Sequence, residues 1–195
     1  ADQLALSIVR ATQRKKSGRA IDKNMGLLEK AIASLPFELT NSQKTSLDEI
    51  LSDMAKPLRM LRLLQGDVGS GKTVVAFLAM LRAVESGAQG ALMAPTEVLA
   101  KQHFKTISEL AGGIGVKVGI LTGRDKGKAR ELLLKQLAEG TISMIVGTHA
   151  LFQADVQFKD LALAVIDEQH RFGVHQRLML ADKGAAADML VMTAT

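Results

Sequence analysis

Six short apolar segments recur along the chain, and amphipathic stretches separate them. The apolar segments cover 60–65, 90–94, 116–121, 142–146, 161–166 and 189–192. Runs of this length, bounded by Gly, Pro or polar residues, are typical of buried strands. Since helical patterns alternate with them, the strands are expected to lie parallel in one sheet with helices on both faces. The pattern therefore predicts an α/β fold.

The stretches between the strands predict helices. Apolar residues at helical spacing mark 1–16, 24–35, 74–81, 97–110, 126–138 and 174–181. A further helix is expected to begin after Thr40 and to end before Pro57, because Thr40 and Gln43 have the spacing of a capping box.

The segment Gly66–Thr73, with the sequence GDVGSGKT, joins the first strand to a helix and fits the pattern G-x-x-x-x-G-K-T. Such a loop points backbone N–H groups inward, and the helix N-terminus adds partial positive charge. Lys72 is expected to reach the β- and γ-phosphates, and the Thr73 hydroxyl to ligate Mg²⁺. The remaining cradle residues are Gly66, Gly69, Ser70 and Gly71. The motif predicts a nucleotide-binding P-loop.

Two carboxylates end the apolar segment 161–166. After a P-loop in such a sheet, Asp167 is expected to hold Mg²⁺ opposite Thr73, and Glu168 to orient and deprotonate the attacking water. These residues follow strands, at the edge where open parallel sheets bind their ligands. Lys72, Asp167 and Glu168 are therefore the expected catalytic residues of a nucleoside triphosphatase.

The composition limits the cellular compartment and the kinds of partner that the chain can have. The chain has no Cys, which excludes disulfides and thiolate metal sites and favours the cytoplasm. No apolar run reaches the roughly 20 residues of a membrane helix, and the N-terminus does not resemble a leader peptide. Seven basic and three acidic residues lie within 1–35. They indicate an anionic partner there, although a solvated helix face explains them equally well.

The sequence DEQH at Asp167–His170 resembles the DExH box of superfamily 2 helicases and translocases, and other motifs of that superfamily follow in order. The resemblance implies a RecA-like P-loop NTPase domain that uses ATP and Mg²⁺. It implies adenine recognition by Phe37 and Gln43, and a link from the γ-phosphate site through His170. The loops implied to contact the nucleic-acid backbone are Pro95-Thr96-Glu97, Leu121-Thr122-Gly123 and Gly147-Thr148-His149. The motif implied to couple that contact to hydrolysis is Thr193-Ala194-Thr195.

Three runs narrow the resemblance to RecG-type DNA translocases of bacteria: LPFELT at 35–40, VGTHAL at 146–151 and DEQHRFGV at 167–174. The motor of transcription-repair coupling factors is the alternative, but it typically has Glu in place of Gln169 and Phe in place of Ser70. The RecG-type resemblance implies action on branched or duplex DNA in the bacterial nucleoid.

The same resemblance implies how the chain is divided. Residues 1–35 would be the helical end of a connection from a DNA-binding wedge domain, and residues 36–195 the first RecA-like domain. The wedge domain and a second RecA-like domain would lie outside this chain. Taken alone, the chain would then be a nucleotide-binding module without turnover, because it lacks the arginine finger of the second domain.

Several expected site residues also have purely structural explanations. A capping box accounts for Gln43, a helix N-cap for Thr96, and a turn at a strand end for Thr122-Gly123. A polar turn would explain Thr148-His149, and a buried, hydrogen-bonded imidazole would explain His170.

Overall fold

The structure, a computed structural model, describes residues 17–167 and 187–195. The helices expected at 1–16 and 174–181 lie outside these residues, as do Glu168 and His170. Within the described part of the chain, no helix is both long enough and apolar enough to cross a membrane.

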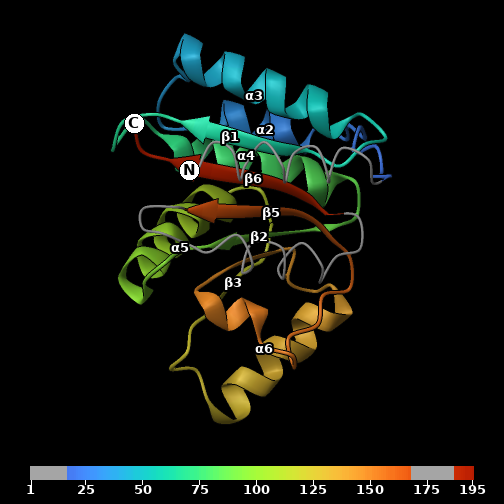
Figure 1. Cartoon of the computed structure of the whole chain (residues 1–195), viewed down its shortest axis with the longest axis vertical. Helices are drawn as coiled ribbons and strands as arrows, with labels where there is room; N and C mark the ends of the chain where they lie inside the picture. The colour runs from blue at the N-terminus through green and yellow to red at the C-terminus, as the bar shows by residue number, and fades with distance from the viewer. Residues whose placement is uncertain (1–16, 168–186) are drawn as a thin grey trace, which may run out of the picture.

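Six parallel strands form one sheet in the order β1-β6-β5-β2-β4-β3, which the labelled strands follow downward in Figure 1. The strands are β1 (Leu61–Gln65), β2 (Gln89–Met93), β3 (Val118–Leu121), β4 (Met144–Gly147), β5 (Leu161–Asp167) and β6 (Asp188–Thr193). β2 and β5 are buried along their whole length, because parallel strands covered on both faces expose neither side. The predicted parallel sheet is confirmed, and its strand bounds lie within two residues of the observed ones.

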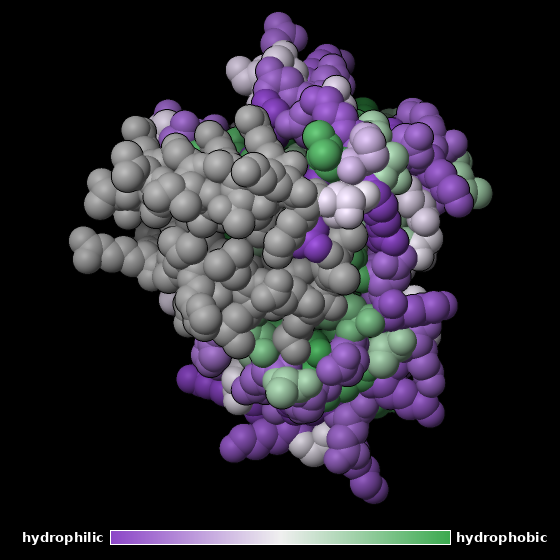
Figure 2. All heavy atoms as spheres, turned by 45° about the vertical axis from the view of Figure 1, so that its right-hand side comes forward, coloured by the Kyte–Doolittle hydropathy of each residue, from purple (hydrophilic) through white to green (hydrophobic). Residues whose placement is uncertain are grey.

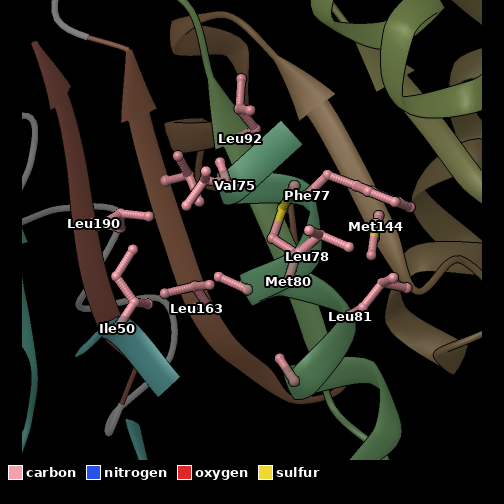
Figure 3. Close-up of a cluster of buried hydrophobic side chains, with 14 of the residues drawn as sticks. Ile50, Val75, Phe77, Leu78, Met80, Leu81, Leu92, Met144, Leu163 and Leu190 are labelled. Carbon is pink, nitrogen blue, oxygen red and sulfur yellow. The ribbon is translucent and has the colours of Figure 1, made fainter. Parts of the chain in front are cut away.

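Among the described residues, four helices build the core on one face of the sheet. They are α2 (Leu27–Ala33), α3 (Asn41–Met54), α4 (Lys72–Glu85) and α5 (Glu97–Gly112). α4 and α5 contact the strands, whereas α2 and α3 pack mainly on α4. Ten of the 14 residues of α4 are buried. Figure 3 shows Phe77 and Met80 of α4 within this core, with Ile50 of α3 beside Leu190 of β6.

The opposite face carries a second core under α6 (Gly127–Glu139) and the 3₁₀ helix η1 (His149–Phe152). Successive strand residues alternate between the two cores: Val165 belongs to the first, and Ile166 to the second. Helices therefore cover both faces, as predicted. In the view of Figure 2, hydrophilic side chains cover the upper and lower ends of the molecule, and apolar ones are visible below the middle.

The starts of α2 and α3 have different local causes. The predicted capping box at α3 is confirmed, since Thr40 Oγ1 accepts from the Gln43 N–H (3.2 Å) and Gln43 Oε1 accepts from the Thr40 N–H (2.9 Å). The helix predicted at 24–35 is shorter than expected. Gly26 has a φ of 82° and its N–H donates to Asn24 Oδ1, so regular helix begins only at Leu27.

Residues 17–35 lie against the rest of the described fold. Ile21 is buried, and its N–H donates to the Met54 carbonyl at 2.8 Å. The N–H groups of Leu27 and Leu28 both donate to Glu85 Oε1, at 2.5 and 3.0 Å. This segment therefore shares the first core with α3 and α4, while the domain boundary after residue 35 stays a prediction.

Candidate nucleotide-binding site

The P-loop connects the carboxyl end of β1 to the first turn of α4. Gly69 and Gly71 have φ angles of 82° and 79°, which L-residues with side chains rarely adopt. A Cβ on Gly71 would lie 2.2 Å from Gln43 Nε2, and one on Gly66 would lie 2.6 Å from Ser70 Oγ. Glycine at these positions keeps the concave side of the loop open, so the loop fits a phosphate group.

Lys72 lies with its ammonium group over this loop. Its Nζ donates to the carbonyl oxygens of Gly66 (2.7 Å) and Asp67 (2.8 Å). A cation at this position suits the negative charge of phosphate groups, and the expected contact of Lys72 with the β- and γ-phosphates stays a prediction. Beside it, a hollow of about 500 Å³ opens between the P-loop and the start of α3.

The two residues expected to recognise adenine line different hollows. Gln43 borders the P-loop hollow, where its Nε2 donates to the Ser70 carbonyl at 3.3 Å. Phe37 is 45% exposed and borders a separate hollow of about 530 Å³ between α2 and α3. Gln43 is thus held by both its capping box and the P-loop, and adenine recognition by either residue stays a prediction.

The expected metal ligands meet through a histidine. Asp167, only 4% exposed, ends β5, and its Oδ2 lies 2.6 Å from Nε2 of His103. The other ring nitrogen of His103, Nδ1, lies 3.2 Å from Thr73 Oγ1. α4, α5 and β5 therefore each contribute one side chain to a continuous Thr73–His103–Asp167 chain.

The donors present suit Mg²⁺. A hydroxyl and a carboxylate are hard oxygen ligands, which Mg²⁺ prefers, and it usually takes its remaining ligands from phosphates and water. Among the described residues, no group of three or more His, Cys, Asp or Glu side chains is positioned to hold a metal by itself. Thr73 and Asp167 therefore fit a metal bound together with a nucleotide, rather than a permanent protein cage.

His103 was not among the residues singled out from the sequence. Its partners lie 30 and 64 residues away along the chain, and within helix 97–110 nothing distinguishes it from a packed histidine. Glu168 and His170 lie outside the described residues, so their roles as base and γ-phosphate link stay predictions.

The loop that follows β2 presents an exposed helix N-terminus. Thr96 caps α5, accepting from the Leu99 N–H at 3.2 Å, and it remains exposed beside Pro95. The adjacent Glu97 is paired with Arg124 (3.0 Å), which ties this loop to the one that follows β3. Thr96 can therefore cap α5 and also make the expected phosphate contact, because the two roles are compatible.

The loops that follow β3 and β4 differ in what they expose. Thr122 is 6% exposed, and both its N–H and its Oγ1 donate to Asp125 Oδ2 (2.6 and 3.1 Å), so its side chain closes the turn. Thr148 is 2% exposed and caps η1. Gly123 and His149 are exposed. A DNA contact through these loops would therefore use the Gly123 backbone and the His149 ring more readily than the two threonine hydroxyls.

The segment after β6 reaches the P-loop directly. The Gly66 N–H donates to the Thr193 carbonyl at 3.3 Å, and the Thr195 hydroxyl donates to Asp67 Oδ1. The P-loop, the metal-ligand chain and the expected coupling motif thus lie at one edge of the sheet.

Comparison with known proteins identifies the family. The family model of DEAD/DEAH box helicases matches residues 40–195. The chain belongs to the DEAD/DEAH box helicase family, and the predicted RecA-like fold is confirmed.

Within that family, the chain is similar to RecG helicases. It is 49% identical to the ATP-dependent DNA helicase RecG of Haemophilus influenzae, over 100% of this chain and 29% of that protein. It is 52% identical to RecG of Staphylococcus epidermidis, over 93% of this chain and 27% of that protein. A solved structure of RecG bound to a three-way DNA junction superposes with a TM-score of 0.85 at 45% identity, covering 98% of this chain and 26% of that one. The chain thus spans less than a third of the length of these relatives.

Proposed function

We propose that this chain is the ATP-binding motor domain of a DNA translocase that remodels branched DNA, such as stalled replication forks and Holliday junctions, in recombination and repair. The observation that carries the proposal is the joint placement of the P-loop, Thr73 and Asp167 at the carboxyl edge of the sheet. The relative solved on a three-way junction supports branched DNA as the substrate. The high identity to RecG helicases favours this function over that of a transcription-repair coupling factor.

In this function each residue has a separate task. The P-loop amides and Lys72 would bind and orient the phosphates, and Thr73 and Asp167 would hold Mg²⁺. Mg²⁺, when bound there, would supply positive charge that neutralises the phosphates. Glu168 orients the attacking water and accepts its proton. We place the protein in the cytoplasm of a bacterium, associated with the nucleoid, because its proposed substrate is chromosomal DNA.

DNA binding would rest mainly on backbone contacts. Exposed groups at the strand-end loops, among them Thr96, Gly123 and His149, are suited to phosphate rather than to base edges. Affinity should therefore fall steeply with salt and depend little on sequence. Within the 195 residues alone, we expect nucleotide binding with little hydrolysis, because an arginine finger raises related NTPase rates by about 10³ to 10⁵.

Nucleotide binding tests the first part of the proposal. Lys72→Ala removes the ammonium group and should weaken ATP binding by roughly 10-fold to 100-fold, the value of a charge-assisted hydrogen bond. Lys117→Ala is the matched control, because Lys117 is exposed and far from the P-loop in sequence. Equal ATP affinity of Lys72→Ala and the control in equilibrium binding would contradict the proposal.

Hydrolysis tests the second part and requires the chain together with a second motor domain. Glu168→Gln keeps the size of the side chain but cannot accept a proton. DNA-stimulated ATP hydrolysis should then fall by at least about 100-fold, with ATP binding retained. A normal rate of hydrolysis in Glu168→Gln would show that Glu168 is not the base.

A further inference from the structure

We propose that His103 is a positioning residue of the metal site, presetting Thr73 and Asp167 for Mg²⁺ through one hydrogen bond to each. The inference rests on the proposed function, since it concerns how this chain binds Mg²⁺ with ATP. The observation that carries it is a single imidazole that contacts both expected ligands, at 3.2 Å from Thr73 Oγ1 and 2.6 Å from Asp167 Oδ2.

The position of His103 is well defined. The residue lies in α5, which packs against α4 and contacts β3 and β4. Its side chain is 12% exposed, and that of Asp167 is 6% exposed. Because the imidazole lies between side chains from α4 and β5, neither ligand can change rotamer freely without losing its hydrogen bond. The ring thus restricts both ligands before any metal binds.

One tautomer of the imidazole satisfies both contacts. With its proton on Nε2, the ring donates to Asp167 Oδ2 and accepts the Thr73 hydroxyl proton at Nδ1. The Thr73 oxygen can then still offer a lone pair to a cation, and within the described part of the chain no hydrogen bond involves the other Asp167 oxygen, Oδ1. The hydrogen-bond directions are therefore those that a pair of metal ligands requires.

Residues that orient a metal ligand without touching the metal affect metal binding strongly. Loss of a group that orients a metal ligand typically costs 10-fold to 100-fold in metal affinity. At this site the effect should be confined to the Mg²⁺-dependent part of nucleotide binding, because the P-loop amides and Lys72 hold the phosphates without His103.

The alternative is that His103 only anchors α5 to β5. An anchor would affect folding stability, and through it nucleotide binding with and without metal alike. A positioning residue would affect the Mg²⁺ requirement and leave binding in the absence of metal unchanged. These outcomes are separable in the full chain.

The experiment measures equilibrium binding of a fluorescent, non-hydrolysable ATP analogue, first in EDTA and then across a Mg²⁺ titration. The variants are His103→Ala, which removes both contacts, His103→Gln, whose amide NH₂ can still donate to Asp167, and His103→Asn, whose oxygen can still accept from Thr73. Lys105→Ala is the control, a change to alanine at an exposed position of the same helix. Thermal unfolding midpoints are measured for all four.

We expect equal affinity in EDTA for all proteins, and a Mg²⁺ midpoint raised 10-fold to 100-fold in His103→Ala but not in Lys105→Ala. His103→Gln and His103→Asn should fall between, each restoring part of the midpoint. If His103→Ala unfolds, the Mg²⁺ midpoints of His103→Gln and His103→Asn test the inference, since each variant retains one of the two hydrogen bonds. Unchanged Mg²⁺ midpoints, or equal losses with and without metal, would overturn the inference. If the unmodified chain binds no analogue in either condition, the proposed function fails and the inference with it.

Discussion

The hydroxyl of Thr195 donates a hydrogen bond to the carboxylate of Asp67, and so joins the segment after β6 to the P-loop. The backbone supports the same connection, since the Gly66 N–H donates to the Thr193 carbonyl. β6 is also paired with both β1, which precedes the P-loop, and β5, which ends at Asp167. A displacement of the residues after β6 would therefore affect both the P-loop and Asp167, the two parts of the proposed nucleotide site.

Thr195→Val should weaken that connection without removing the nucleotide site. Valine has nearly the same shape but no hydroxyl, so one hydrogen bond worth roughly 0.5 to 1.5 kcal/mol is lost. We expect ATP affinity to change less than about threefold and DNA stimulation of hydrolysis to fall about 2-fold to 10-fold. ATPase assays with and without branched DNA, in the protein that carries a second motor domain, measure this. Thr141→Val, at an exposed loop position, is the control; a normal DNA stimulation in Thr195→Val would contradict the prediction.

Gly71→Ala should cost more stability than Gly87→Ala. Both glycines have a φ of 79°, which costs an L-residue about 1 to 2 kcal/mol, but only a Cβ on Gly71 would meet another atom, Gln43 Nε2 at 2.2 Å. The excess cost at Gly71 should disappear when both glycine substitutions are repeated in a Gln43→Ala background. Urea unfolding of the unmodified chain and the five variants measures the difference. Equal costs of the two glycine substitutions in the unmodified background would exclude the contact as a cause.

Glu85→Ala should loosen α2. The Glu85 carboxylate accepts from the N–H groups of Leu27 and Leu28, and its side chain is fully buried. Its removal leaves two amides without an acceptor and should destabilise the fold by about 2 to 4 kcal/mol.

Hydrogen exchange at Leu27 and Leu28 reports this directly, and both amides should lose protection in Glu85→Ala. Glu85→Gln retains an acceptor and should lose about half as much stability. The control is Glu139→Ala, an exposed carboxylate whose pair with Lys135 at 3.9 Å contributes little. Unchanged protection of the two amides in Glu85→Ala would show that Glu85 does not hold α2.

Because of Asp188, stability should fall as pH rises from about 4 to about 7. Burial raises the pKa of this carboxyl to about 7, although its hydrogen bond from the Met60 N–H and the nearby Arg19 and Arg59 favour the charged form. The unfolded chain ionises near the ordinary value of 3.8. Between these values the folded state binds more protons than the unfolded state, so the free energy of unfolding falls with pH and levels off above about 7. Since a difference of one in pKa corresponds to about 1.4 kcal/mol, the free energy of unfolding should fall by about 4 kcal/mol in total.

Asp188→Asn should remove that fall, because asparagine accepts from Met60 and does not ionise. Urea unfolding at several pH values between 4 and 8 should show a flatter profile for Asp188→Asn than for the unmodified chain. Asp22→Asn, at an exposed position, should leave the slope as it is. A slope that persists in Asp188→Asn would place its origin in other groups.

The sequence predicts those features whose causes are local. Buried parallel strands are continuous apolar runs, and the capping box at Thr40 needs only four adjacent residues, so both could be read directly. The start of α2 could not, because it depends on the left-handed Gly26 and on Glu85, 58 residues from Leu27. The same limit applies to His103, whose significance arises only when α4, α5 and β5 are brought together.

The burial of α4 limits which parts of this domain can move in the proposed function. The helix that begins at Lys72 has ten of its 14 residues inside the core, and a close-packed interior does not deform gradually. Tilting or sliding this helix at each turnover would require the whole first core to repack. If the domain moves in the proposed function, we therefore expect α4 to stay fixed within the core and the loops at the carboxyl edge of the sheet to move.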